Sequence, residues 1–96
     1  MGWDFKHSNL FGAKIWLDSE NRRILLTEAF GRNKREFDFS EVKSVHTGKA
    51  RTSNNHMMFL TVKDLKKPEY GIEFSTKIKL DEWFSRLQVA LDLDLR

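Results

Sequence analysis

The chain has 96 residues, of which 40% are hydrophobic and 32% are charged, and its formal net charge is +3. Eight Phe, three Trp and one Tyr are too many large apolar side chains for a disordered segment, and this length accommodates one compact domain. The absence of cysteine excludes disulfide bonds and thiolate metal sites, and no apolar stretch is long enough for a transmembrane helix.

Alternation of apolar and polar residues predicts antiparallel strands between residues 12 and 75, after an N-terminal segment over residues 1–11. The pattern places these strands at residues 14–18, 23–27, 35–39, 41–46, 56–63 and 70–75, with turn-forming clusters between them. The apolar side of each strand is expected to face the core. Seven residues are assigned to the core in this way: Ile15, Leu17, Ile24, Leu26, Met58, Leu60 and Val62. The segment from Gly48 to Asn55 has no large apolar residue, so we expect a mobile loop there.

The period of the pattern changes near Lys79, where apolar residues begin to recur at helical spacing. These residues are Leu80, Trp83, Phe84, Leu87 and Leu91, and they predict an amphipathic helix over residues 78–92. We expect Asp81 and Glu82 in its first turn, where the helix dipole favours negative charge. The sequence therefore predicts a single α+β domain over residues 1–96, an antiparallel sheet or barrel of about six or seven strands closed by one C-terminal helix.

Two segments carry a resemblance to a known family: Phe37-Asp-Phe39-Ser-Glu-Val42, which leads into a strand, and Glu82-Trp83-Phe84-Ser-Arg-Leu87 in the closing helix. With the order of elements over roughly residues 12–92, they resemble the small bacterial pleckstrin-homology-like domains, some of which are encoded by prophages. The resemblance implies a barrel or bent sandwich that is closed by a Trp-bearing helix and serves as a non-catalytic binding scaffold. Related domains that hold phosphoinositides use a basic first hairpin loop, but Asp18 and Glu20 lie in that loop here.

Residue patterns typical of catalysis and of metal binding are absent from the sequence. His7, His46 and His56 have neither metal-ligand spacing nor a cysteine companion, so we expect surface or strand-end histidines and no metal or cofactor. The sequence also contains no P-loop, no Gly-x-Gly-x-x-Gly and no Gly-x-Ser-x-Gly. We therefore expect a protein that is not an enzyme, and a small enzyme is the third of the functions considered.

Four apolar residues, Trp16, Leu25, Met57 and Phe59, point away from the predicted core. Exposed together, they would form a larger apolar surface than a monomer normally shows, and they would bind a partner. In the alternative interpretation, the N-terminal segment Trp3-Asp4-Phe5 or the helix covers them, and the sequence leaves both open. The first function that we predict is a non-catalytic protein-interaction module, which binds a protein partner or associates with itself.

The middle of the chain is electropositive, because residues 49–79 contain seven basic and three acidic side chains. This charge supports an alternative function, the electrostatic binding of nucleic acid or of an anionic membrane. The residues expected to hold the anion are Lys49, Arg51, Lys66 and Lys67, unless they belong to an ordinary solvated loop. Residues 1–6 contain no apolar run behind a basic stretch, so we expect no secretory signal and a cytoplasmic location.

Overall fold

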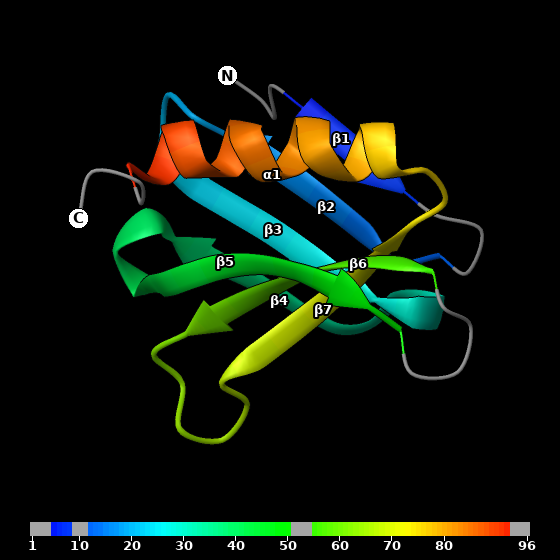
Figure 1. Cartoon of the computed structure of the whole chain (residues 1–96). Helices are drawn as coiled ribbons and strands as arrows, with labels where there is room; N and C mark the ends of the chain where they lie inside the picture. Colours follow the sequence, from blue (N-terminus) through cyan, green and yellow to red (C-terminus); the bar gives the residue numbers. More distant parts are fainter. Residues whose placement is uncertain (1–4, 9–11, 51–54, 93–96) are drawn as a thin grey trace.

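Seven antiparallel strands form two sheets, and one helix follows them (Figure 1). The computed structural model describes residues 5–8, 12–50 and 55–92. The four-stranded sheet consists of β1 (Phe5–Ser8), β2 (Lys14–Asp18), β3 (Arg23–Glu28) and β4 (Arg32–Asp38), in that spatial order. The three-stranded sheet consists of β5 (Val42–Lys49), β6 (His56–Val62) and β7 (Glu69–Phe74). Two short 3-10 helices, η1 (Ala29–Gly31) and η2 (Phe39–Glu41), flank β4, and α1 spans Lys77–Leu91.

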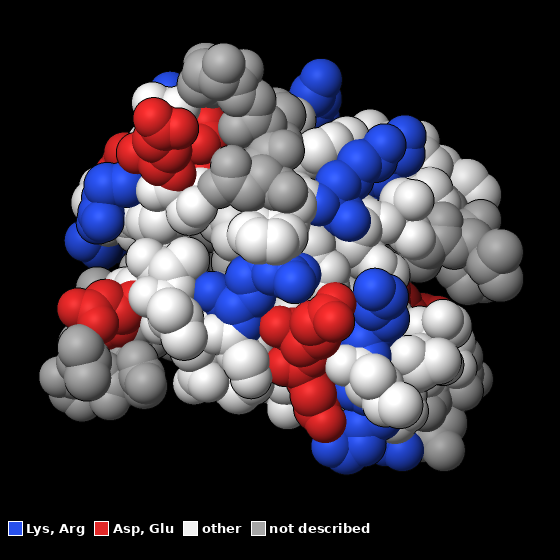
Figure 2. All heavy atoms as spheres, turned by 90° about the horizontal axis from the view of Figure 1, so that it is seen from above, with Lys and Arg blue, Asp and Glu red and all other residues white. Residues whose placement is uncertain are grey.

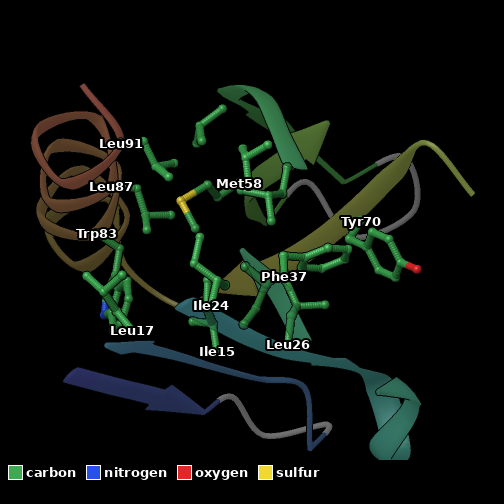
Figure 3. Packing of buried hydrophobic residues seen from close by; sticks show 14 of the residues in the cluster. Ile15, Leu17, Ile24, Leu26, Phe37, Met58, Tyr70, Trp83, Leu87 and Leu91 are labelled. Carbon is green, nitrogen blue, oxygen red and sulfur yellow. The ribbon is translucent and has the colours of Figure 1, made fainter. Parts of the chain in front are cut away.

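The core lies between the apolar faces of the two sheets and beneath α1, which packs on β5, β6 and β7. Side chains from α1 and from both sheets point toward one another in this core, with Met58 among them (Figure 3). All seven residues that the alternation assigns to the core are buried, and so are Trp83 and Leu87 of α1. The predicted α+β architecture with one closing helix is therefore confirmed.

The hairpin of β2 and β3 follows the predicted alternation. Its register pairs Ile15 with Leu26 and Leu17 with Ile24, so that all four side chains face the core. The turn is fixed by the buried carboxylate of Asp18, which accepts hydrogen bonds from the backbone N–H of Asn21 at 3.1 Å and from its side-chain amide at 2.9 Å. An Asp that bonds the backbone in this way is a strong local turn signal, which explains why the turn was predictable.

The structure corrects several boundaries. It adds β1 within the segment 1–11, where the alternation predicts no strand. It extends β5 through Gly48 and Lys49, which were expected in a loop, because they pair with Met57 and His56 of β6. Residues 51–54 of that expected mobile loop lie outside the described residues. Phe39, predicted at the end of a strand, belongs to η2, and its side chain is buried.

The start of α1 also differs from the prediction. The helix begins at Lys77, and the hydroxyl of its N-cap residue Thr76 accepts a hydrogen bond from the backbone N–H of Lys79 at 3.2 Å. Asp81 and Glu82 consequently lie beyond the first turn, which contains no acidic residue. Asp81 pairs instead with Lys77 at 2.9 Å, in the spacing of four residues that stabilises exposed helices.

Candidate functional site

The four residues predicted to bind a partner lie in two separate pairs. Trp16 and Leu25 are cross-strand neighbours on the outer face of the four-stranded sheet. Met57 and Phe59 lie on the outer face of the three-stranded sheet. All four side chains are half-buried. Because the two sheets share the core between their inner faces, the structure brings together the members of each pair but not all four residues.

The ring of Phe59 lies across two glycines on the neighbouring strands. A Cβ atom added at Gly48 would lie 3.2 Å from Cε2 of Phe59, and one added at Gly71 would lie 3.3 Å from Cδ1 of the same ring. The Gly71 Cβ would also lie 2.9 Å from Cε of Met57. His46 of β5, the cross-strand partner of Phe59, stacks on the same ring with ring centroids 5.2 Å apart. We call the surface of His46, Gly48, Met57, Phe59 and Gly71 the Phe59 face.

The Phe59 face continues into a hollow of about 390 Å³ at the tip of the β3–β4 hairpin. Met57 and Gly71 line it on one side, and Phe30 and Arg32 line it on the other. Phe30 is 75% exposed and has a left-handed backbone, with φ of 61° and ψ of 26°. A bulky residue in this conformation is strained by roughly 1–2 kcal/mol. Such strain is concentrated at functional sites, where a side chain has to be held in one place.

Glu28 fixes the hairpin tip to the edge of the three-stranded sheet. Its carboxylate accepts a hydrogen bond from the side-chain amide of Asn33 at 2.8 Å and one from the backbone N–H of Gly71 at 3.5 Å. The ammonium group of Lys67 lies 3.2 Å from the same carboxylate. These contacts join β3, β4, β7 and the loop before β7, so the wall of the hollow that carries Phe30 is firmly placed.

The charges at the rim of the hollow are mixed. The guanidinium group of Arg32 lies 6.0 Å from the ring centroid of Phe30 and has no ion-pair partner among the described residues. The carboxylate of Glu73 accepts a hydrogen bond from the side-chain amide of Asn55 at 2.6 Å. The hollow therefore combines apolar residues with one cation, Arg32, and two carboxylates, Glu28 and Glu73. Such a mixed lining suits the side chain of a protein partner better than a purely ionic ligand.

The basic residues predicted to hold an anion are not gathered in one place. Lys49 ends β5 beside the start of β6, whereas Lys66 and Lys67 lie in the loop that follows the end of β6 (Figure 1). The seven residues of β6 separate the two positions by roughly 20 Å. Lys67 forms an ion pair with Glu28, and its ammonium group lies 4.8 Å from the ring centroid of Tyr70. Arg51 lies outside the described residues.

The face of the molecule seen from above, over α1, shows no patch of a single sign. Acidic and basic side chains alternate along it (Figure 2). Pairs such as Lys77 with Asp81, at 2.9 Å, and Lys79 with Glu82, at 3.4 Å, account for part of this pattern. In the part of the chain that the structure describes, no helix is long and apolar enough to cross a membrane.

One further charged cluster joins the two sheets. Nη1 of Arg35 donates to the carboxylate of Asp64 at 2.7 Å and to the hydroxyl of Tyr70 at 3.3 Å. The bond to Arg35 holds the pKa of Asp64 below its usual range, and the same bond raises the pKa of Arg35. Over the described ranges 5–8, 12–50 and 55–92, no three His, Cys, Asp or Glu side chains gather as a metal site.

The chain matches no family model, no curated protein and no solved structure. The strand order, the division into sheets of four and three strands and the closing helix are consistent with a pleckstrin-homology-like fold. Phe30 is the main residue of the site that the sequence analysis does not identify. The signal that points to it is an aromatic residue next to Gly31 in the break between two strands, a place where a large side chain has little to pack against.

Proposed function

We propose that the protein is a pleckstrin-homology-like domain that works as a non-catalytic protein-interaction module, and that it contacts its partner through the Phe59 face and Phe30. The observation that carries this proposal is Phe30, an aromatic side chain that is 75% exposed and held there by a strained backbone. The ring lies outside the buried core. Its exposure is explained if a partner covers it.

The rest of the surface has the composition of an interface centre. Aromatic residues and Met are enriched at such centres, and a few of them supply most of the binding energy. Phe30, Met57 and Phe59 provide them here, and the hollow between Phe30 and Met57 offers room for one inserted side chain. The two glycines beside Phe59 leave its ring spread over the sheet, so that it forms a flat contact area.

The resemblance to small bacterial pleckstrin-homology-like domains supports the same function. It implies a binding scaffold without catalytic residues, in a bacterial or prophage protein. A cytoplasmic location and the absence of enzymatic activity stay predictions from the sequence. The partner is a second copy of the chain or another protein, and sedimentation of the purified protein distinguishes the two.

The proposal is tested by replacing Phe30 with glycine. Phe30→Gly removes the exposed ring and relieves the left-handed strain, so the free energy of unfolding should rise by roughly 0.5–1 kcal/mol. That gain corresponds to a melting temperature about 4 °C higher. The variant should nevertheless fail to retain partners that the wild type captures from the source cell, or should lose self-association in sedimentation.

The matched control is Leu65→Ser, which removes an apolar side chain that is 100% exposed in the loop before β7. This variant should keep every partner, because Leu65 lies outside the Phe59 face and the hollow. The proposal is wrong if Phe30→Gly folds and captures the same proteins as the wild type. It is also wrong if the Leu65→Ser control loses them to the same extent.

A further inference from the structure

We propose that the outer face of the four-stranded sheet binds single-stranded nucleic acid, with a base stacked on Trp16 and the flanking phosphates on Lys6 and Lys14. This site is separate from the Phe59 face, which lies on the other sheet, and so it is independent of the proposed function. It also differs in place from the basic residues between positions 49 and 79.

The register of β1 and β2 assembles the site. Lys6 lies directly opposite Trp16, and Lys14 precedes Trp16 by two residues on the same face of β2. The ammonium groups of Lys6 and Lys14 lie 5.8 Å and 5.9 Å from the centroid of the Trp16 ring. The ring itself is half-buried against the sheet, next to its cross-strand neighbour Leu25. Two flexible cations therefore accompany one firmly seated aromatic surface.

Neither Lys6 nor Lys14 has an ion-pair partner among the described residues, whereas Arg23, farther along the same sheet, is paired with Glu36. Because their side chains are long and reach past the ring, the ammonium groups can leave it and bind phosphates on either side of a stacked base. Trp16 would then contribute stacking, and the lysines would contribute counterion release.

This arrangement favours a single strand over other anionic partners. A sheet face that carries an aromatic ring and lysines can stack an unpaired base, whereas the bases of a duplex are stacked on one another and leave no free face for Trp16. Polybasic segments that hold anionic membranes gather about four to eight Lys or Arg, whereas two lysines flank Trp16 here. An acidic peptide would satisfy the lysines but would leave the Trp16 ring without a role.

The test uses an unstructured thymidine oligonucleotide of about twelve residues at about 20 mM salt, with tryptophan fluorescence as the readout. The wild type should bind with quenching, and Trp16→Leu should bind about tenfold more weakly and lose that quenching. The double variant Lys6→Ala/Lys14→Ala should reduce the slope of log K against log salt by about 1.4, since each phosphate contact to a single strand contributes about 0.7.

The control is Lys49→Ala/Lys66→Ala, which removes the same net charge from β5 and from the loop before β7 and should leave binding within about twofold of wild type. The proposal is overturned if the wild type does not bind the oligonucleotide, or if it binds a duplex of the same length equally well. It is also overturned if Lys49→Ala/Lys66→Ala weakens binding as much as Lys6→Ala/Lys14→Ala does. Unchanged binding by Trp16→Leu also overturns it. If Trp16→Leu does not fold, the comparison of the two lysine variants decides.

Discussion

The imidazole of His7 occupies a place at the edge of the core where an apolar side chain would be expected. It stacks on Phe74 with ring centroids 4.2 Å apart and lies 6.4 Å from the ring of Trp83, so β1 is attached to both β7 and α1 through this ring. Its Nε2 atom is buried and has no hydrogen-bond partner among the described residues. A neutral imidazole tolerates this position better than a charged one.

Stability should therefore fall when His7 is protonated. Burial lowers the pKa of His7, the nearby Lys79 lowers it further, and a hydrogen bond to the backbone of Glu73 partly offsets both. Because the unfolded chain has the ordinary pKa of about 6.5, it binds the proton first as the pH falls. Above the unfolded-state pKa, neutral His7 makes its full contribution to stability. This contribution is lost as the pH falls through the lower pKa that His7 has in the folded protein.

The measurement is urea unfolding at pH 7.5 and at pH 5.5 for the wild type and for His7→Phe, which keeps a ring against Phe74 but cannot be protonated. The wild type should lose more stability between the two pH values than the variant does. Equal losses would show that other groups cause the acid dependence and that His7 is not held neutral. The other titratable groups of the chain are the same in both proteins, so the comparison isolates His7.

At the scale of elements, packing holds α1 in place more than capping does. Trp83 is 2% exposed and is surrounded by residues of the core, so Trp83→Ala should lower the free energy of unfolding by roughly 3–5 kcal/mol. Thr76→Ala removes only the N-cap hydrogen bond and should cost about 1 kcal/mol. Denaturant unfolding of both variants gives the comparison. A Trp83→Ala protein that melts within about 2 °C of the wild type would contradict the role of α1 as the closing element.

Elements whose pattern repeats within the segment itself could be predicted from the sequence. The alternation in β2 and β6 and the helical spacing in α1 identify both the elements and their buried sides. β1 could not be predicted, because it has four residues and is held by contacts that are distant in the sequence, such as that of His7 with Phe74. An N-cap such as Thr76 becomes evident only when the first helical residue is known.

The candidate site was less predictable for a related reason. Alternation shows that Trp16 and Phe59 point away from the core, but it does not show which strands share a sheet. The four residues therefore form one surface in the prediction and two pairs in the structure. The exposure of Phe30 depends on a left-handed backbone that the sequence indicates only through the neighbouring Gly31.

At the scale of the whole molecule, the two sheets present outer faces of different chemistry. The four-stranded sheet carries Trp16 with two lysines that have no ion-pair partner among the described residues. The three-stranded sheet carries the Phe59 face, whose ring spreads over two glycines and adjoins the hollow beside Phe30. The shared core keeps these faces apart, so the two proposed binding sites would not block each other.

The most direct test of the central claim, that the Phe59 face is the contact surface, is partner capture by Phe59→Glu. The side chain is half-buried on the outer side of β6, so the variant should fold with a loss of roughly 1 kcal/mol. Circular dichroism and thermal melting check the fold, and Leu25→Glu, on the outer face of the other sheet, is the matched control. We predict that Phe59→Glu loses the partner while Leu25→Glu keeps it. A folded Phe59→Glu protein that captures everything the wild type captures would contradict the account.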